Sequence, residues 1–546
     1  IFNPCAKENV VNSKIPKIMN LIFCITYSLF ILWKSKLPLS STANILYSDL
    51  KFFQKYTNNL IEHSDYFYLT LFAAIIISLI VITEGLAKRE IVHKEIARKM
   101  LHLSAVLLAA YASIIFENYS VLIAAAGAAT ILTFFAVFKK LIPSIHQDRS
   151  LSWGIFFFPL SYFLLLLLLG KENKEIIALS FLILAFSDSF AAIIGTFISK
   201  QYFNLTGDKK SLIGSLTFFS ITLIILVVIP REFNLLINDK ISFTALTSIA
   251  IVVTIFEAIS SKGFNNFIVP IISSLLLLIF VDNQQIQNQF VIGMGLSAVV
   301  AVISYKVKFL TVDGSAATFL LAGLIFGLGG WMWSLPILTF FILSSVLSKV
   351  RKKVNEEVEL YFEKSSTRDY MQVVANGGIG GILVIVNQFI NSDLIYLIYL
   401  SSLAAVCADT WATEIGTLKQ TTTYNILNLK PVEQGISGGI SLLGTSGAVL
   451  GAFVISLSGI FWIEFSFINY VLLIVFTGVA GSLFDSILGA TIQAKNKCDV
   501  CNKITEKKHH CGEQTSHYNG LHWLNNDIVN LLAGLSGGIL ILVLVW

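Results

Sequence analysis

The chain has 546 residues, of which 55% are hydrophobic and 13% are charged, and its mean hydropathy is +0.77. This composition excludes a soluble enzyme with a single membrane anchor and is typical of a polytopic membrane protein. The net charge of +5 reflects basic loops rather than a surface for nucleic acid, so we expect no nucleic-acid partner. Apolar runs of roughly 17 to 25 residues recur along nearly the whole chain. They predict an all-α membrane helical bundle of about fifteen spans.

The apolar runs and the loops between them divide the chain into three segments. Residues 1–66 hold one span and a polar linker, residues 67–288 form a first membrane domain, and residues 289–546 form a second. Loops such as 139–149 and 349–364 are basic, whereas the loops on the opposite side are shorter and contain fewer basic residues. Cytoplasmic loops of membrane proteins carry an excess of Lys and Arg. We therefore expect a cytoplasmic active face, where a polar cosubstrate binds while a lipid substrate arrives from the membrane.

The helix expected after the basic loop at 88–90 begins with polar residues on one face. They are spaced i, i+3, i+4 and i+7, and are Glu95, Arg98, Lys99 and His102. Such residues can bind a charged ligand at the membrane surface. Alternatively, they are interfacial side chains that extend their charged ends to water while their stems lie in the membrane.

A nine-residue segment occurs twice, once in each domain. Residues 187–195 and 408–416 align without gaps, and both contain an Asp, a Ser or Thr, an aromatic residue, an Ala, two variable positions, an Ile and a Gly. Small residues at i+3, i+4 and i+7 from Asp188 and Asp409 share one helix face, where another helix or a phosphate-bearing ligand can approach. A carboxylate in a membrane helix is costly and indicates a functional site. A polar residue that packs helices is the alternative interpretation.

A loop that suits phosphate follows the first of these Asp residues. Lys210 and Ser211 precede Gly214 and Ser215 at the expected start of a helix. Together they offer an ammonium, hydroxyls and backbone N–H groups to a phosphate. The spacing is not that of a P-loop. Glu257, in a later apolar run, is a second carboxylate suited to metal coordination.

Polar residues follow the same order in both domains, at nearly equal spacings: an Arg, the Asp, a Lys and a second carboxylate. They are Arg149, Asp188, Lys210 and Glu257 in the first domain, and Arg368, Asp409, Lys430 and Asp485 in the second. We interpret this order as an ancient tandem duplication of one membrane catalytic unit, which gives two related halves. Chance placement of polar residues in two apolar halves is the alternative.

Cysteine and histidine residues gather near the C-terminus, in the loop at 495–520. Two cysteines are separated by two residues, and His and Cys follow the second of them nine and ten positions later: Cys498, Cys501, His510 and Cys511. This spacing can close a tetrahedral zinc site, which would be structural because three or four protein ligands leave little room for a substrate. Unligated cysteines in a reducing cytoplasm are the alternative.

Four motifs of the first domain resemble those of a known family. They are Arg98-Lys99-x2-His102, Asp188-Ser189-Phe190-Ala191, Lys210-Ser211-x2-Gly214-Ser215, and the segment from Glu257 through Asn266 to Pro270. In these motifs residues 80–285 look like the dolichol/phytol kinase family, whose members are polytopic enzymes that use CTP to phosphorylate polyprenyl alcohols.

The second domain is similar to the membrane family that contains phytyl-phosphate kinase. The resemblance covers residues 290–546 and rests on Asp313-Gly314-Ser315-Ala316, Gly329-Gly330-Trp331, Ala375-Asn376-Gly377-Gly378, the segment from Ala408 to Gly416, Gly435-x-Ser437-Gly438-Gly439, Asp485-Ser486, and Asn526-Asp527-x-Val529-Asn530. The Cys/His loop also resembles one in some prokaryotic members.

The two resemblances imply two successive phosphorylations, of phytol or a related prenol to its monophosphate and then to its diphosphate, with CTP as the phosphoryl donor. They imply Mg²⁺ bound by Asp188, Glu257, Asp409 and Asp485, with Lys210 and Lys430 as further catalytic residues. They also imply contacts to the nucleotide and the phosphates from Arg98, Lys99, Arg149, Ser211, Gly214, Ser215, Asn266, Asp313, Arg368, Asn376, Gly438, Asn526 and Asp527. The partners would be a prenol, a prenyl phosphate, a nucleoside triphosphate and membrane lipid.

These implications place the protein in a bacterial inner membrane or in a plastid envelope or thylakoid membrane. A CTP:phosphatidate cytidylyltransferase-like enzyme and a transporter built from repeats are the alternatives. If Asp409 and Asp485 hold one nucleotide-bound Mg²⁺, their carboxyl groups should lie within about 8 Å of each other. Lys430 should then point into the same cleft.

Overall fold

The structure is a computed structural model that describes residues 50–89, 94–139, 153–199, 201–235, 237–355, 367–462, 467–507 and 509–545. Within these ranges, 12 helices are long and apolar enough to cross a membrane, and three shorter apolar helices accompany them. The strands of the described residues form only small sheets of two or three strands. The prediction of an all-α membrane fold is therefore confirmed. Arg149 and the span expected before residue 50 lie outside the described residues.

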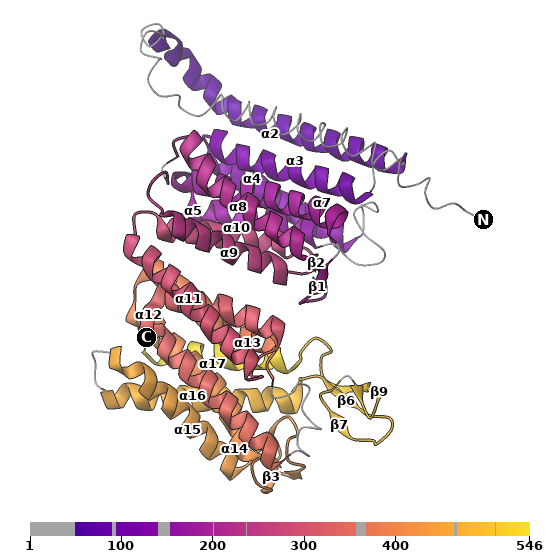
Figure 1. The fold of residues 1–546 in the computed structure, drawn as a ribbon, viewed down its shortest axis with the longest axis vertical. Coiled ribbons are helices and arrows are strands. Elements are labelled where there is room, and N and C mark those ends of the chain that lie inside the picture. The colour runs from indigo at the N-terminus through magenta and orange to yellow at the C-terminus, as the bar shows by residue number, and fades with distance from the viewer. Residues whose placement is uncertain are drawn as a thin grey trace, which may run out of the picture. The chain divides into compact units, whose positions relative to one another are not determined.

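The chain folds as two compact units, residues 1–284 and 285–546 (Figure 1). The first unit contains α2 (Leu50–Lys88), α3 (Lys94–Ile115), α4 (Tyr119–Phe138), α5 (Gly154–Leu169), α6 (Lys174–Ile183), the π-helical turn η3 (Leu184–Asp188), α7 (Ser189–Ile198), the hairpin β1 (Tyr202–Asn204) and β2 (Lys209–Ser211), α8 (Leu212–Glu232), α9 (Phe243–Ile259) and α10 (Asn265–Phe280). Asp188 ends the π-helical turn, a local irregularity that is frequent at functional sites.

The second unit has seven helices and two groups of short strands in its described residues. They are α11 (Gln284–Lys306), α12 (Val312–Val354), α13 (Tyr370–Ile390), α14 (Asp393–Gly416), β3 (Thr423–Asn425), β4 (Pro431–Val432), β5 (Gly439–Ile440), α15 (Leu442–Gly459), α16 (Phe467–Thr491), β6 (Lys495–Lys497), β7 (Ile504–Thr505), β8 (His509–His510), β9 (Glu513–Gln514), β10 (Ser516–Asn519) and α17 (Asn526–Val545). Strands β4, β3 and β5 pair in that order before α15, and β10, β6 and β7 pair between α16 and α17.

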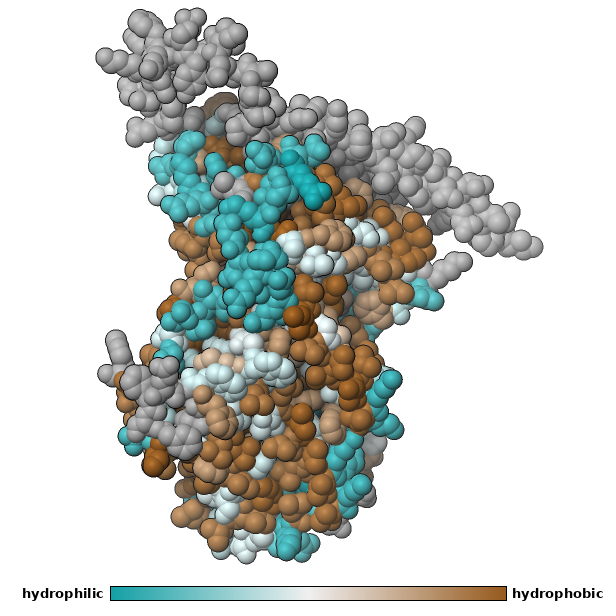
Figure 2. All heavy atoms as spheres, turned by 60° about the vertical axis from the view of Figure 1, so that its left-hand side comes forward, coloured by the Kyte–Doolittle hydropathy of each residue, from teal (hydrophilic) through white to brown (hydrophobic). Residues whose placement is uncertain are grey.

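On the face shown in Figure 2, extensive hydrophobic areas of the described residues lie beside hydrophilic ones. Large apolar side chains are exposed on α4, α5, α16 and α17, among them Leu132, Phe138, Leu168, Ile468 and Val543. Soluble proteins rarely expose extensive contiguous apolar surface, whereas lipid tails solvate it well. The outer faces of these helices therefore suit contact with lipid.

Helix α14 is the centre of the second unit. It packs against α12, α13, α15, α16 and α17, and it is the most buried of the candidate spans in the described residues (Figure 1). Glycines of its neighbours allow this close packing, since a Cβ on Gly451 would lie 2.9 Å from the Cys407 carbonyl oxygen, and a Cβ on Gly537 2.8 Å from that of Ser401. Small residues let helix backbones approach closely in a membrane. The tight packing holds the end of α14 that carries Asp409.

In the first unit, the helix that follows Asp188 packs closely on the start of α8. Gly195, seven residues after Asp188, faces Gly214, and a Cβ on Gly195 would lie 3.3 Å from the Gly214 Cα. Ser211 caps α8, because its Oγ accepts a hydrogen bond from the Gly214 N–H at 3.1 Å. The cap and the glycine contact together fix the loop that carries Lys210 beside the Asp helix.

The second unit has the same local arrangement. Gly416, seven residues after Asp409, faces Gly444 of α15, and a Cβ on Gly416 would lie 3.0 Å from the Gly444 Cα. The Ser441 Oγ accepts a hydrogen bond from the Gly444 N–H at 3.1 Å. The residue directly before this serine is Ile440, so Ile440 occupies the place that Lys210 occupies in the first unit.

Candidate functional site

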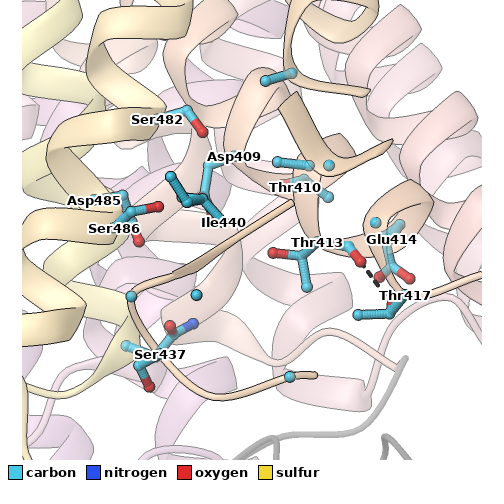
Figure 3. Close-up of a pocket in the computed structure, with 18 of the residues that line it drawn as sticks. Asp409, Thr410, Thr413, Glu414, Thr417, Ser437, Ile440, Ser482, Asp485 and Ser486 are labelled. Carbon is cyan, nitrogen blue, oxygen red and sulfur yellow. Dashed lines mark hydrogen bonds between the residues drawn. The ribbon is translucent and has the colours of Figure 1, made fainter. Parts of the chain in front are cut away.

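A cavity of about 230 Å³ lies in the second unit, near the end of α14 (Figure 3). Polar residues from α12, α13, α14, α16, α17 and the loops between them line it, including Arg351, Arg368, Gln372, Asp409, Thr413, Glu414, Ser437, Asp485, Glu506, Asn526 and Asn530. The first turns of α13, α15 and α17 also contribute to the lining. The free N–H groups and the dipoles of helix N-termini favour an anion. The cavity therefore suits a polar ligand that carries negative charge.

Two carboxylates from neighbouring helices share this cavity. Asp409 belongs to α14 and Asp485 to α16, and both lie beside the loop that contains Ser437 and Ile440 (Figure 3). Asp485 is buried, and its Oδ2 has no hydrogen-bond partner. Among the described residues, no ion pair involves either carboxylate. Uncompensated carboxylates in a membrane protein are costly unless a cation joins them, so the pair is a candidate for cation binding.

Arg368 is a buried cation in the same cavity. Its side chain lies over two aromatic rings, with Cζ 5.2 Å from the centre of the Phe340 ring and 5.7 Å from that of Phe341. No carboxylate forms an ion pair with Arg368 within the described residues. A buried guanidinium that makes no direct ion pair in the described part of the chain is suited to bind a phosphate or carboxylate of a ligand.

The loop at residues 434–441, which we call the Gly/Ser loop, forms one wall of the cavity. Gly438 has a φ of +84°, and a Cβ there would lie 2.5 Å from the Ala490 Cβ of α16, so only glycine fits. The side chain of Gln434 donates hydrogen bonds to the Gly416 and Lys419 carbonyl oxygens, each at 2.7 Å. These contacts fasten the loop to the end of α14.

Two residues that sequence reasoning missed form a buried ion pair beside the cavity. The Arg351 Nε lies 2.8 Å from the Glu414 Oε2, and the Ser348 hydroxyl donates to the Glu414 Oε1 at 2.5 Å. Glu414 lies five residues after Asp409, in the repeated segment, where the first copy has Ile193. This replacement of an apolar residue in the first copy by an acidic residue in the second is the signal by which the sequence identifies Glu414.

A third missed residue, Glu506, enters the cavity from the Cys/His loop. Its Oε1 accepts hydrogen bonds from the Ser437 hydroxyl at 2.5 Å and from the Gln493 side-chain amide at 2.9 Å. In the sequence, the one signal that marks Glu506 is its position between the pair Cys498 and Cys501 and the pair His510 and Cys511. Glu506 reaches the cavity because the Cys/His loop folds back onto the Gly/Ser loop.

Some predicted residues of the second unit do not line this cavity. Lys430 is exposed in the turn between β3 and β4 and is not among the cavity residues, so the expectation that it points into the cleft is wrong. Asp313 accepts hydrogen bonds from the Thr311 hydroxyl at 2.6 Å and from the Tyr370 N–H at 3.1 Å, and therefore joins the starts of α12 and α13. Asp527 is buried at the start of α17 but outside the lining.

The other predicted residues of this unit come together. Arg368, Asn376, Asp409, Gly438, Asp485 and Asn526 all line the cavity. They come from five separate segments of the chain. The packing of α13, α16 and α17 around the end of α14 is what brings them to one place.

In the first unit, Asp188 is buried among protein partners. The Lys99 Nζ lies 2.6 Å from its Oδ2, the His102 Nε2 lies 3.5 Å from the same oxygen, and the Asn265 side-chain amide donates to its Oδ1 at 2.9 Å. Arg98 precedes Lys99 on α3. The carboxylate of Asp188 is thus neutralised by the protein itself.

A second ion pair of the first unit joins Lys210 to Glu257 of α9. Burial lowers the pKa of Lys210, but the carboxylates of Glu257, Asp188 and Asp208 together raise this pKa by more. The net pKa of Lys210 is therefore raised, and its ammonium stays charged at neutral pH. Lys210 lies near both acids of the predicted metal site.

Three of the remaining predicted residues of the first unit, Ser211, Gly214 and Asn266, have structural contacts. Ser211 and Gly214 form the cap of α8, and Ser215 is the next residue of that helix. The Asn266 side chain donates to the Gly154 carbonyl oxygen at 2.9 Å and so attaches α10 to α5. Ser211, Gly214 and Asn266 thus support the local fold, whereas the buried Ser215 Oγ has no hydrogen-bond partner among the described residues.

The structure brings the four predicted zinc ligands together. One ligand atom each from Cys498, Cys501, His510 and Cys511 lies within 4.8 Å of all the others. Cys498 is buried, and the His510 Nδ1 lies 3.5 Å from the Cys501 Sγ and 3.2 Å from the Cys511 Sγ. The bound metal itself stays a prediction.

Several known proteins are similar to this chain. A membrane protein of Methanocaldococcus jannaschii, itself uncharacterized, is 30% identical over 264 residues, which cover 48% of this chain and 96% of that protein. Protein PGR of Arabidopsis thaliana is 28% identical over 271 residues, 45% of this chain and 93% of that protein. The chloroplastic protein VTE6 of the same plant is 25% identical over 228 residues, 41% of this chain and 61% of that protein. No solved structure matches the chain.

The family described as "Integral membrane protein DUF92" matches residues 295–538. This range includes all the residues that line the cavity of the second unit. The apolar helices agree with the family's description as membrane proteins. The chain therefore belongs, through its second unit, to the DUF92 family of integral membrane proteins.

Proposed function

We propose that the second unit is a prenyl-phosphate kinase site that transfers the terminal phosphoryl group of CTP to a prenyl monophosphate. The observation that carries this proposal is that one cavity contains Asp409, Asp485 and Arg368, none of which forms an ion pair among the described residues. Uncompensated acids suit a metal-bound nucleotide, and an uncompensated cation suits an anionic acceptor. The resemblance of this half to the phytyl-phosphate kinase family supports the same reaction.

The residues present fit a bound Mg²⁺. Mg²⁺ prefers carboxylate and phosphate oxygens, and the buried Asp485 Oδ2 lacks a hydrogen-bond partner. Asp409 and Asp485 would hold the ion, with amide oxygens such as that of Asn526 nearby. When bound, Mg²⁺ supplies positive charge to the nucleotide phosphates.

The proposed acceptor, a prenyl monophosphate, has a charged phosphate and an apolar chain, and the surroundings of Arg368 suit both parts. A smaller pocket of about 50 Å³ adjoins the polar cavity and shares Arg368, Gln372 and Asn376 with it. The rest of this pocket is mostly apolar and comes from α11, α12 and α13, with residues such as Val300, Leu321, Ile337, Phe340 and Phe341. A phosphate bound to Arg368 would thus lie where a polar cavity meets an apolar one. This arrangement suits a phosphate attached to a hydrocarbon chain.

The chemistry requires positioning and charge neutralisation rather than a proton acceptor. An oxygen of the acceptor phosphate, already anionic, forms a bond to the terminal phosphorus of CTP. The bond between that phosphorus and the bridging oxygen breaks, and CDP leaves with the bonding electrons. Arg368 would orient the acceptor, and the N–H groups of the Gly/Ser loop and of the helix starts would bind the donor phosphates.

For the first unit we propose the preceding step, the phosphorylation of phytol or a related prenol. The motivation is the placement of Asp188, Lys210 and Glu257 in one polar cluster, together with the resemblance to the dolichol/phytol kinase family. Here the acceptor hydroxyl must lose a proton, and His102, 3.5 Å from Asp188, is placed to accept it. The pairs Lys99–Asp188 and Lys210–Glu257 must open when a metal-bound nucleotide enters.

One assay tests both steps. Purified protein in detergent is supplied with CTP, Mg²⁺ and either phytol or phytyl monophosphate, and the products are separated as mono- and diphosphates. We expect diphosphate from the monophosphate, with release of one CDP per turnover. Release of no CDP from any of a panel of prenyl phosphates would contradict the kinase proposal. A transporter would instead require a sealed vesicle, so activity in detergent separates the two functions.

A further inference from the structure

The Cys/His loop, residues 495–520, is folded as a compact element between α16 and α17. Strands β10, β6 and β7 form its sheet, and β8 and β9 form a hairpin that carries His510. Positive φ angles occur at Asn502, directly after the first ligand pair, and at Cys511, the last residue of the second pair, and mark sharp turns of the chain. These two turns bring Cys498 and Cys501 to face His510 and Cys511.

The geometry of the four ligand atoms fits zinc. In a tetrahedral site with Zn–S bonds of about 2.3 Å and Zn–N bonds of about 2.0 Å, neighbouring ligand atoms lie about 3.5 to 3.8 Å apart. The separations of 3.5 Å and 3.2 Å between the His510 Nδ1 and two sulfurs are close to these values. The set of three Cys and one His is a common structural zinc site.

The same loop is attached to the cavity at one point. Glu506 directly follows β7, five residues after Cys501 and four before His510. Its carboxylate accepts the hydrogen bond from Ser437, and its backbone carbonyl accepts one from the Asn496 side chain at 3.3 Å. Lys495 also reaches the Ser437 carbonyl oxygen, at 3.5 Å. The sheet of the Cys/His loop thus meets the Gly/Ser loop at Ser437.

We propose that a zinc ion bound by Cys498, Cys501, His510 and Cys511 holds Glu506 in the cavity, and that Glu506 in turn fixes the Gly/Ser loop. The sheet of the Cys/His loop is too small to bury a hydrophobic core, so its fold depends on the metal. Without zinc, Glu506 leaves Ser437 and the Gly/Ser loop loses its outer support. Glu506 is a positioning residue in this arrangement.

The metal content and the coupling to the Gly/Ser loop are independent of the reaction that the cavity performs. Only the consequence for phosphoryl transfer rests on the proposed function. If zinc fixes the loop but no kinase activity is found, the coupling stands and the proposed function fails. If the protein is an active kinase but contains no zinc, the proposed function stands and the coupling fails.

The test combines elemental analysis with hydrogen exchange of the full chain in detergent. We expect about one zinc per chain in protein purified without chelators. The double variant Cys501→Ser/Cys511→Ser should lose the zinc and exchange the amides of residues 433–441 at least tenfold faster. Because His509 is not among the ligands, His509→Ala is the matched control and should keep both the zinc and the protection. His510→Cys, which preserves four ligands, should keep them as well.

Substitutions of Glu506 separate the metal from the contact that it supports. Glu506→Ala should keep the zinc but expose residues 433–441 to faster exchange, whereas Glu506→Gln, which can still accept from Ser437, should stay close to the parent protein. Absence of zinc overturns the proposal. So does unchanged protection of residues 433–441 after a mercurial reagent and a chelator have removed the zinc from the parent protein. Because this removal needs no variant, a misfolded variant does not leave the question open.

Discussion

The two units place an aspartate in the same local packing but neutralise it differently. In each unit the Asp lies seven residues before a glycine that contacts the start of the next helix. In the first unit Lys99 and Asn265 bind Asp188 directly. In the second, neither Asp409 nor Asp485 has an ion-pair partner among the described residues.

The difference shows that the same packing of an Asp-bearing helix can hold a carboxylate paired with a protein cation or a carboxylate available to a ligand's cation. A buried carboxylate must be compensated, either by a cation of the protein or by a cation of the ligand. The first unit provides its own cations for Asp188 and Glu257. In the described part of the second unit, Asp409 and Asp485 have no such cation, so a metal-bound nucleotide should stabilise this unit.

The largest effect should follow from removal of the internal cation of the first unit. Lys99→Met leaves the buried Asp188 without its closest partner and should lower the free energy of unfolding by about 3–5 kcal/mol. Lys240→Met is the matched control, because it breaks the exposed pair with Asp282 and should cost less than about 1 kcal/mol. Denaturant titration in detergent measures both. Equal losses would show that the compensation of Asp188 does not depend on Lys99.

The next effect should separate the two reactions. Asp409→Asn should slow the conversion of phytyl monophosphate to diphosphate by about 10²- to 10³-fold, because it removes charge at the proposed metal site. The same variant should leave the phosphorylation of phytol unchanged, and Asp188→Asn should do the reverse. Asp313→Asn, which alters a carboxylate outside the cavity, is the control and should change neither rate more than a few-fold. Loss of both steps in well-folded Asp188→Asn protein would refute two separate sites.

A smaller effect should identify the acceptor side of the second cavity. Arg368→Gln should raise the KM for prenyl monophosphate by about tenfold to hundredfold, because a charge-assisted hydrogen bond contributes about 1.5–3 kcal/mol. The KM for CTP should change little. Arg368→Lys keeps the charge but loses the planar fork, and should give an intermediate value. An equal rise in both KM values would place Arg368 on the donor side.

The smallest effect concerns Lys430. This side chain is exposed and outside the cavity, so Lys430→Ala should change the rate of diphosphate formation by less than about twofold. Lys210→Ala, in contrast, should slow the first step much more than twofold, because Lys210 contacts Glu257 and lies near Asp188. A large loss in Lys430→Ala would mean that the β3–β4 turn closes over the cavity during the reaction.

The sequence by itself determined the features that depend on local spacing. Composition and long apolar runs are sufficient to predict a membrane helical bundle, because only helices satisfy their backbone groups within one segment in lipid. The repeated segments predicted Asp188 and Asp409, and the glycine pattern predicted the Gly/Ser loop beside Asp409. The spacing of Cys498, Cys501, His510 and Cys511 predicted their cluster, since short loops limit how far these residues can separate.

Only the tertiary structure decided which charges meet. Lys430 follows Asp409 at nearly the same spacing as Lys210 follows Asp188, yet it lies outside the cavity. The second unit forms the three-stranded sheet of β3, β4 and β5 here, and Ile440 takes the equivalent place. Glu506 lies far from Asp409 in the chain and enters the cavity through the fold of the Cys/His loop. Electrostatic compensation depends on distances in space, and loops of different length bring different side chains to the same point. For this reason the pairing of Asp188 with Lys99, and the lack of such a pair for Asp409 within the described part of the chain, became visible only in the folded protein.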